Sequence, residues 1–127
     1  MKEKQARNIL VVDDDADILN YLSEVLRKAK FRVLSTTRGE EAVRLATQEK
    51  PDLIILDVIL PDVLGGVVAK RLSENPATAR IPIIFLSGLN TKEDEDIARE
   101  KAGNYYLLGK PVTNEELLAV VQRALSG

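Results

Sequence analysis

Five short apolar runs, separated by stretches with helical spacing, are the feature that most constrains how this chain can fold. The runs lie at 8–13, 31–36, 52–57, 81–87 and 104–109. Short runs rich in β-branched residues, alternating with helical patterns, are typical of buried parallel strands. Right-handed crossovers between such strands produce one parallel sheet with helices on both faces. The sequence therefore predicts an α/β fold with a doubly wound, five-stranded parallel sheet.

The intervals between these runs carry apolar residues at the 3.6-residue spacing of amphipathic helices. The helices are expected at 16–29, 39–49, 65–74, 91–102 and 113–125. Asp15 is the expected N-cap of the first helix, and Thr113-x-x-Glu116 forms a capping box before the last. Because the five strand–helix pairs leave no stretch for another unit, we expect one domain over residues 1–127, with 1–7 as a flexible N-terminal segment.

Composition excludes several kinds of chemistry. A chain of 127 residues with 45% apolar content has enough material for one core. It has no cysteine and no histidine, so disulfides, thiolate metal sites and a histidine general base are all excluded. A net charge of −2 without a basic cluster argues against nucleic-acid binding. No stretch has the length of a signal peptide or a membrane span, so we expect a cytoplasmic protein with no membrane partner.

Polar residues close four of the five apolar runs. They are Asp13 at the end of the first run with Asp14 directly after it, Asp57 at the end of the third, Ser87 at the end of the fourth and Lys110 after the fifth. Ligands of open parallel sheets bind at the carboxyl ends of the strands, so these side chains are expected to converge. Carboxylates of this kind suit Mg²⁺, which is commonly bound by one or two of them together with phosphate. The set predicts a site for a divalent metal and a phosphoryl group.

Each of these residues also has a chemical role that fits such a site. A carboxylate beside a metal, such as Asp57, can act as a nucleophile toward phosphorus. Pro61 and Gly65 break the chain after this strand and are expected to leave the carboxylate exposed. Ser87 has a hydroxyl for a phosphoryl oxygen, and Lys110 has an ammonium, a common phosphate partner.

Each residue also has a simpler alternative. The Asp13-Asp14 run could serve only as a turn and N-cap, and Asp57 as a helix cap or solvated loop acid. Ser87 could be an ordinary loop serine and Lys110 an exposed surface lysine.

The first acidic run also matches part of a calcium-binding loop. Asp13, Asp15 and Asp17, with Glu24 at the twelfth position, have the ligand spacing of an EF-hand. The sixth position of that loop requires glycine, but Ile18 stands there, and the stretch falls inside an amphipathic helix. The sequence therefore disfavours a calcium loop.

The order of these motifs resembles that of response-regulator receiver (CheY-like) domains of two-component signal transduction, over essentially the whole chain. The ordered set is the acidic pair Asp13-Asp14, Asp57-x-x-x-Pro61-x-x-x-Gly65, Ser87 and Lys110-Pro111. The resemblance implies a flavodoxin-like (βα)5 fold with strand order 2-1-3-4-5. It also implies a cis peptide bond between Lys110 and Pro111, which is physically accessible before proline.

The resemblance further implies a function for the strand ends. Asp57 would accept a phosphoryl group from a histidine kinase or a histidine phosphotransfer protein. Mg²⁺, with Mn²⁺ as an alternative, would be bound by Asp14, Asp57, the Ile59 carbonyl and, through water, Asp13. Ser87 and Lys110 would then contact the phosphoryl oxygens.

Such a chain is expected to be a signalling module and not a turnover enzyme. Phosphorylation would change the surface formed by the fourth helix, the fifth strand and the fifth helix, and so signal to an unidentified output protein.

Two departures from the usual receiver pattern carry predictions. Leu107 stands where family members usually have an aromatic residue, and strand alternation places Tyr106 on the opposite face. We therefore predict that the Tyr106 ring changes little on phosphorylation. Ile59 and Leu89, two residues beyond Asp57 and Ser87, are apolar and would exclude an attacking water. This predicts slow self-dephosphorylation.

Two other functions compete with this interpretation. A metal-dependent phosphatase of the haloacid-dehalogenase type would use Asp13 as nucleophile and Asp15 as the acid–base residue. Asp17 stands where that family has a hydroxyl residue, and no acidic pair follows Lys110. A receiver fold kept only as an unphosphorylated scaffold is the other alternative, and the retention of all five polar site positions counts against it.

Overall fold

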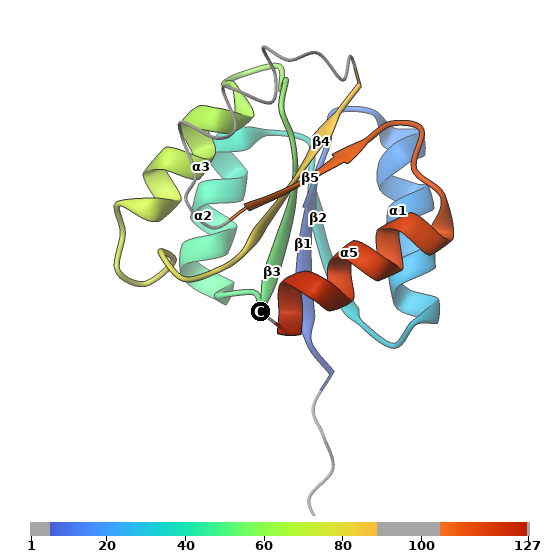
Figure 1. Ribbon diagram of the computed structural model, residues 1–127. Coiled ribbons are helices and arrows are strands. Elements are labelled where there is room, and N and C mark those ends of the chain that lie inside the picture. The colour runs from blue at the N-terminus through green and yellow to red at the C-terminus, as the bar shows by residue number, and fades with distance from the viewer. Residues whose placement is uncertain (1–5, 89–104, 127) are drawn as a thin grey trace, which may run out of the picture.

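A parallel sheet with the strand order β2-β1-β3-β4-β5 forms the centre of the fold, as the computed structural model shows for residues 6–88 and 105–126 (Figure 1). Its strands are β1 Asn8–Val12, β2 Arg32–Thr36, β3 Leu53–Asp57, β4 Ile83–Ser87 and β5 Tyr105–Gly109. Every neighbouring pair is parallel. The predicted strand order is confirmed, and each predicted strand is found within two residues of its expected bounds.

Helices cover both faces of this sheet. They are α1 Ala16–Lys28, α2 Gly39–Glu49, α3 Gly65–Ser73 and α5 Asn114–Ser126. Figure 1 shows α2 and α3 on one side of the sheet and α1 and α5 on the other. The helix predicted at 91–102 lies outside the described residues. Among the helices in the described part of the chain, none is long and apolar enough to cross a bilayer.

The core consists of two apolar clusters, one on each face of the sheet. Alternation along β1 places Leu10 and Val12 in the cluster under α2 and α3, and Ile9 and Val11 in the cluster under α1 and α5. All residues of β3 and β4 are buried. Their runs are continuously apolar up to the final polar residue because both faces of these strands are covered.

The predicted helix starts are confirmed by their hydrogen bonds. Asp15 Oδ1 accepts from Asp17 N at 2.9 Å and caps α1. At α5, Glu116 N donates to Thr113 Oγ1 at 3.1 Å and Thr113 N donates to Glu116 Oε1 at 3.1 Å. This reciprocal pair is a capping box.

The last strand also has the predicted alternation. Leu107 packs with the cluster under α2 and α3, whereas Tyr106 packs with the cluster under α1 and α5. Tyr105 meets Phe85 edge to face, with ring centroids 6.0 Å apart. The peptide bond between Lys110 and Pro111 is cis, as expected.

Candidate functional site

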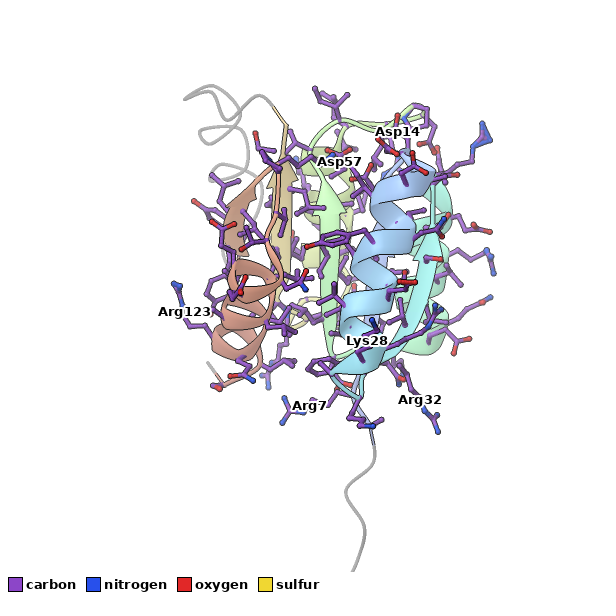
Figure 2. All side chains as sticks on the ribbon, turned by 90° about the vertical axis from the view of Figure 1, so that its right-hand side faces the viewer. Arg7, Asp14, Lys28, Arg32, Asp57 and Arg123 are labelled. Atoms are coloured by element: carbon purple, nitrogen blue, oxygen red, sulfur yellow. The ribbon has the colours of Figure 1, made fainter. Side chains whose placement is uncertain are left out.

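The polar residues singled out in the sequence converge at the carboxyl edge of the sheet. Asp57 is the last residue of β3, and Ser87 is the last residue of β4 and lies in register with Gly109. Lys110 N then donates to Ser87 O at 3.0 Å, which places Lys110 beside the end of β4. Asp14 and Asp57 lie at the same end of the molecule (Figure 2). β1 pairs with β2 on one side and β3 on the other, so this edge is the topological switch point where α/β folds bind ligands.

Three carboxylates form the centre of this site. Asp13 and Asp14 both lie beyond the last residue of β1, where the chain is turning, and so escape strict strand alternation. One oxygen each from Asp13, Asp14 and Asp57 lies within 4.8 Å of the others. Asp13 is 0% and Asp57 only 7% exposed. The expectation of an exposed Asp57 carboxylate is therefore wrong, because Lys110 and the chain after β3 lie against it.

The Lys110 ammonium bridges two of these carboxylates. Its Nζ lies 2.9 Å from Asp13 Oδ2 and 3.3 Å from Asp57 Oδ2, and the side chain is 19% exposed. These distances contradict the alternative that Lys110 is an ordinary surface lysine. A single ammonium facing two buried carboxylates neutralises only part of their charge.

Four basic side chains lie toward the opposite end of the molecule from Asp14 and Asp57 (Figure 2). They are Arg7, Lys28, Arg32 and Arg123.

The electrostatics of the site follow from burial and crowding. Burial raises the pKa of Asp57 to about 6, with a further contribution from the Asp13 charge, against the opposing effects of Lys110 and the Ile59 amide. Burial alone lowers the pKa of Lys110, but its contacts with Asp13 and Asp57 outweigh this and hold that pKa above its ordinary value. The site thus has an excess of negative charge.

A divalent cation fits this arrangement. Asp13 Oδ2, although buried and ion-paired, accepts no directed hydrogen bond among the described residues. Crowded carboxylates with spare lone pairs are stabilised by a bound cation. Because all the donors are oxygens and one carboxylate is exposed to water, the set suits Mg²⁺. The EF-hand alternative is contradicted, because Asp15 caps α1 and Asp17 lies within that helix.

Gly65 brings the start of α3 against the end of β3. A Cβ atom at this position would lie 2.2 Å from the Asp57 carbonyl oxygen. Gly65 N donates to Val58 O at 2.7 Å, and Ile59 and Leu64 form an isolated antiparallel bridge. The close approach requires glycine and fixes the loop that follows Asp57.

Asp62 is a structural contact of this loop that the sequence reasoning missed. Its carboxylate accepts from Gly39 N at 2.9 Å and from Glu40 N at 3.0 Å, and so caps α2 from a different segment of the chain. The Glu40 amide, followed by the Gly39 amide, lowers the pKa of Asp62. An acid directly after Pro61 resembles any loop acid, and no local pattern connects it with residues 39 and 40.

Comparison with known proteins identifies the family. The sequence profile of the response regulator receiver domain matches residues 9–122. The chain belongs to this family. The receiver domain is 32% identical over 119 residues to the protein PilH of Pseudomonas aeruginosa, covering 94% of this chain and 98% of PilH.

The receiver domain also matches parts of longer regulators. It is 37% identical to the transcriptional regulatory protein GltR of Pseudomonas aeruginosa, covering 94% of this chain and 49% of GltR. It is 35% identical to the alkaline phosphatase synthesis transcriptional regulatory protein PhoP of Bacillus subtilis, covering 94% of this chain and 48% of PhoP. The chain thus spans about half the length of these relatives.

Solved structures share the whole fold. A response regulator from Chloroflexus aurantiacus superposes with a TM-score of 0.91 at 32% identity, covering 97% of this chain and 100% of that one. The receiver domain of the sensor histidine kinase PA1611 from Pseudomonas aeruginosa has a TM-score of 0.90 at 27% identity, covering 97% and 100%. That crystal structure has a magnesium ion coordinated in its active-site cleft. Receiver domains bind Mg²⁺ in an acidic site and take part in signalling with histidine kinases or phosphotransfer proteins.

Proposed function

We propose that this receiver domain accepts a phosphoryl group on Asp57 and thereby switches its contacts with an output protein. The observation that carries the proposal is the Lys110 ammonium, which lies 2.9 Å from Asp13 and 3.3 Å from Asp57. Phosphoryl transfer depends mainly on positioning and charge neutralisation. This lysine supplies a positive charge next to the carboxylate that would attack.

The chain's own residues account for the transfer step. An oxygen of ionised Asp57 attacks phosphorus and forms a P–O bond, while the P–N bond of a donor phosphohistidine breaks and its electron pair stays on the imidazole nitrogen. With a pKa of about 6, Asp57 is largely ionised at neutral pH. Lys110 and the Ser87 hydroxyl, which lies at the neighbouring strand end, hold the oxygens of the transferred group.

The metal would be held by the acidic cluster. Asp14, Asp57 and the Ile59 carbonyl are the proposed direct ligands, with Asp13 acting through water, for Mg²⁺ or alternatively Mn²⁺. When bound, the cation neutralises the charge of the carboxylates and of the phosphoryl oxygens. The cluster of three carboxylates within 4.8 Å supports this assignment.

The signal would leave through a surface that includes β5 and α5; the helix predicted at 91–102, which we also expect at this surface, lies outside the described residues. Tyr106 lies in the cluster under α1 and α5, opposite Leu107, so we expect its ring orientation to change little on phosphorylation. A large rotation of Tyr106 between the two states, seen by NMR, would contradict this expectation.

Self-dephosphorylation is proposed to be slow. Ile59 is 51% exposed beside the acceptor, and its side chain has no polar group to orient a water. Leu89, the other residue of this prediction, lies outside the described residues. The double variant Ile59→Asn, Leu89→Glu should shorten the phosphoryl lifetime, and an unchanged lifetime would refute the idea.

Intact mass after incubation with Mg²⁺ and acetyl phosphate tests the assignment of Asp57. One added phosphoryl group is expected in the wild type and none in Asp57→Asn. Asp52→Asn is the matched control, because Asp52 precedes the same strand at its other end and accepts from Asn8 N at 2.8 Å. No added group in the folded wild type would favour the scaffold alternative.

The same measurement tests the phosphatase alternative. That mechanism needs Asp15 as an acid–base residue, but Asp15 Oδ1 accepts from Asp17 N at 2.9 Å and from Ile18 N at 3.4 Å as the cap of α1. A phosphoryl group that persists in Asp57→Asn and disappears in Asp13→Asn would restore the phosphatase interpretation.

A further inference from the structure

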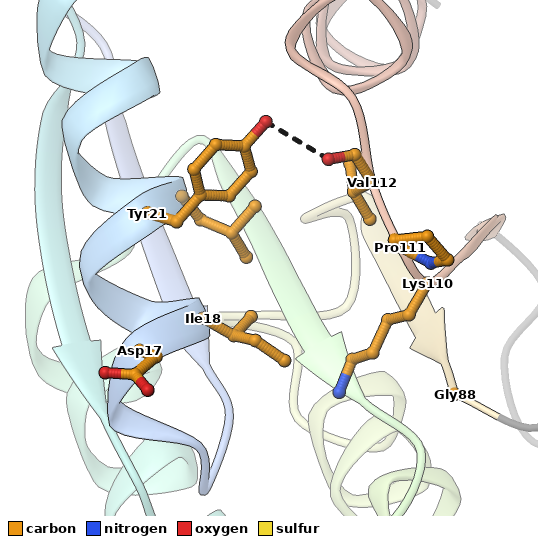
Figure 3. Close-up of a pocket in the computed structure, with 8 residues that line it drawn as sticks. Asp17, Ile18, Tyr21, Gly88, Lys110, Pro111 and Val112 are labelled. Carbon is orange, nitrogen blue, oxygen red and sulfur yellow. Dashed lines mark hydrogen bonds between the residues drawn. The ribbon is translucent and has the colours of Figure 1, made fainter.

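Tyr21 connects α1 to the loop that follows β5. Its hydroxyl donates to Val112 O at 3.1 Å (Figure 3) and also to Asn114 Oδ1. These partners are 91 and 93 residues away along the chain. Tyr21 is 41% exposed, so burial of its ring does not explain why a large aromatic residue stands at this position.

The hydroxyl reaches two acceptors with one proton. A phenol has a single proton to donate, and the Val112 carbonyl oxygen and Asn114 Oδ1 both accept from it. Tyr21 thus contacts the backbone of the loop after β5 and the side chain of the first residue of α5.

The rest of the gap between α1 and this loop is open. A cavity of about 600 Å³ lies there. It is lined by Asp17, Ile18, Tyr21, Leu22, Gly88, Lys110, Pro111 and Val112. Because the side chains leave this volume unfilled, packing holds the loop to α1 only weakly, and the hydrogen bond from Tyr21 to Val112 spans the cavity (Figure 3).

The loop held in this way begins with Lys110. Val112 and Asn114 stand two and four residues after it, and the intervening residue is a proline with a fixed φ. On its other side, Lys110 N donates to Ser87 O at 3.0 Å. The backbone at Lys110 is thus held by β4 on one side and by Tyr21 on the other.

We infer that Tyr21 is a positioning residue for Lys110. By holding Val112 and Asn114 against α1, its hydroxyl keeps the Lys110 ammonium between Asp13 and Asp57. Its effect on phosphoryl transfer rests on the proposed function of Asp57. The effect of Tyr21 on the metal-free site and on cation affinity is independent of that function.

Removing the hydroxyl has opposite effects on cation binding and on phosphoryl transfer. A loosened Lys110 repels a divalent cation less, so Tyr21→Phe binds Mg²⁺ more tightly. The same loosening moves the positive charge of Lys110 away from the Asp57 carboxylate, so phosphorylation by acetyl phosphate at saturating Mg²⁺ slows. We expect each change to be about twofold to tenfold, the factor corresponding to one net hydrogen bond. If Tyr21→Phe only damaged the fold, it would lower both the Mg²⁺ affinity and the rate of phosphoryl transfer.

The test is a double-mutant cycle with Lys110→Ala, read by calorimetric titration with MgCl₂. Tyr21→Phe should raise Mg²⁺ affinity in the wild-type background and have no effect when Lys110 is alanine. Hydrogen exchange of residues 109–114 in the metal-free protein should be faster in Tyr21→Phe. Ser73→Ala is the matched control, because it removes a hydroxyl-to-carbonyl bond of 2.7 Å at the end of α3.

Several outcomes overturn the inference. One is an equal change in Mg²⁺ affinity on Tyr21→Phe in the wild-type and Lys110→Ala backgrounds. Another is a fall of both Mg²⁺ affinity and transfer rate. A third is a Tyr21→Phe variant whose Mg²⁺ affinity, transfer rate and hydrogen exchange all match the wild type. If the wild type takes no phosphoryl group, the proposed function fails, whereas the affinity cycle and the hydrogen exchange still decide the role of Tyr21.

Discussion

Replacing Asp57 by asparagine is expected to stabilise the metal-free domain near neutral pH. In the folded protein this carboxyl is 7% exposed and lies in the same cluster as buried Asp13. Burial, then the charge of Asp13, raises its pKa from 3.8 to about 6. Asparagine at this position would keep the shape of the side chain and remove the charge. The benefit should appear only where the wild-type carboxyl is ionised.

The magnitude and sign follow from proton linkage. Between pH 3.8 and about 6 the folded state binds the Asp57 proton more tightly than the unfolded state, so the free energy of unfolding falls as pH rises. At about 1.4 kcal/mol for each pH unit, the full cost above pH 6 is about 3 kcal/mol. Asparagine still buries a polar group, so we expect a net gain of about 1–3 kcal/mol at pH 7.5. No gain is expected at pH 3.5.

Urea unfolding in EDTA, followed by circular dichroism at a series of pH values, measures this difference. Asp52→Asn is the control and should show no rise of this kind between pH 4 and 7. Adding Mg²⁺ should reduce the difference in unfolding free energy between Asp57→Asn and the wild type, because a ligand that binds only the folded state stabilises the wild type. An Asp57→Asn variant that is no more stable than wild type at pH 7.5, or equally stabilised at pH 3.5, would refute the electrostatic reasoning.

Three further predictions concern stability. Gly65→Ala should cost about 2–4 kcal/mol in urea unfolding, because its Cβ would meet the Asp57 carbonyl oxygen at 2.2 Å. Gly88→Ala, with its nearest atom at 3.8 Å, should cost under about 1 kcal/mol; equal costs would contradict the steric argument. Lys110→Met should lower the free energy of unfolding by about 1–3 kcal/mol at pH 8 and by less at pH 4.5, where Asp57 is largely protonated; a pH-independent loss would show that packing dominates. Glu116→Ala should cost about 1 kcal/mol through loss of the capping box, and thermal unfolding unchanged within error would refute that role.

The local patterns of the chain were sufficient for most of the architecture. The period of apolar residues is set by backbone geometry, so it predicts each described helix and strand wherever it occurs. Capping at Asp15 and at Thr113-x-x-Glu116 uses hydrogen bonds between residues two or three positions apart, and both are present. The receiver-family order of motifs identified the strand order 2-1-3-4-5, which is the observed one.

The sequence by itself also determined that the five polar site residues would share one edge, because parallel strands end on the same side of a sheet. Only the tertiary structure decided that Asp57 is buried and that Lys110 lies between Asp57 and Asp13. It alone revealed the cap from Asp62 to α2 and the contact from Tyr21 to Val112. Each of these joins residues tens of positions apart. Such contacts depend on how packed elements direct their side chains toward one another, and no local period of the sequence encodes that.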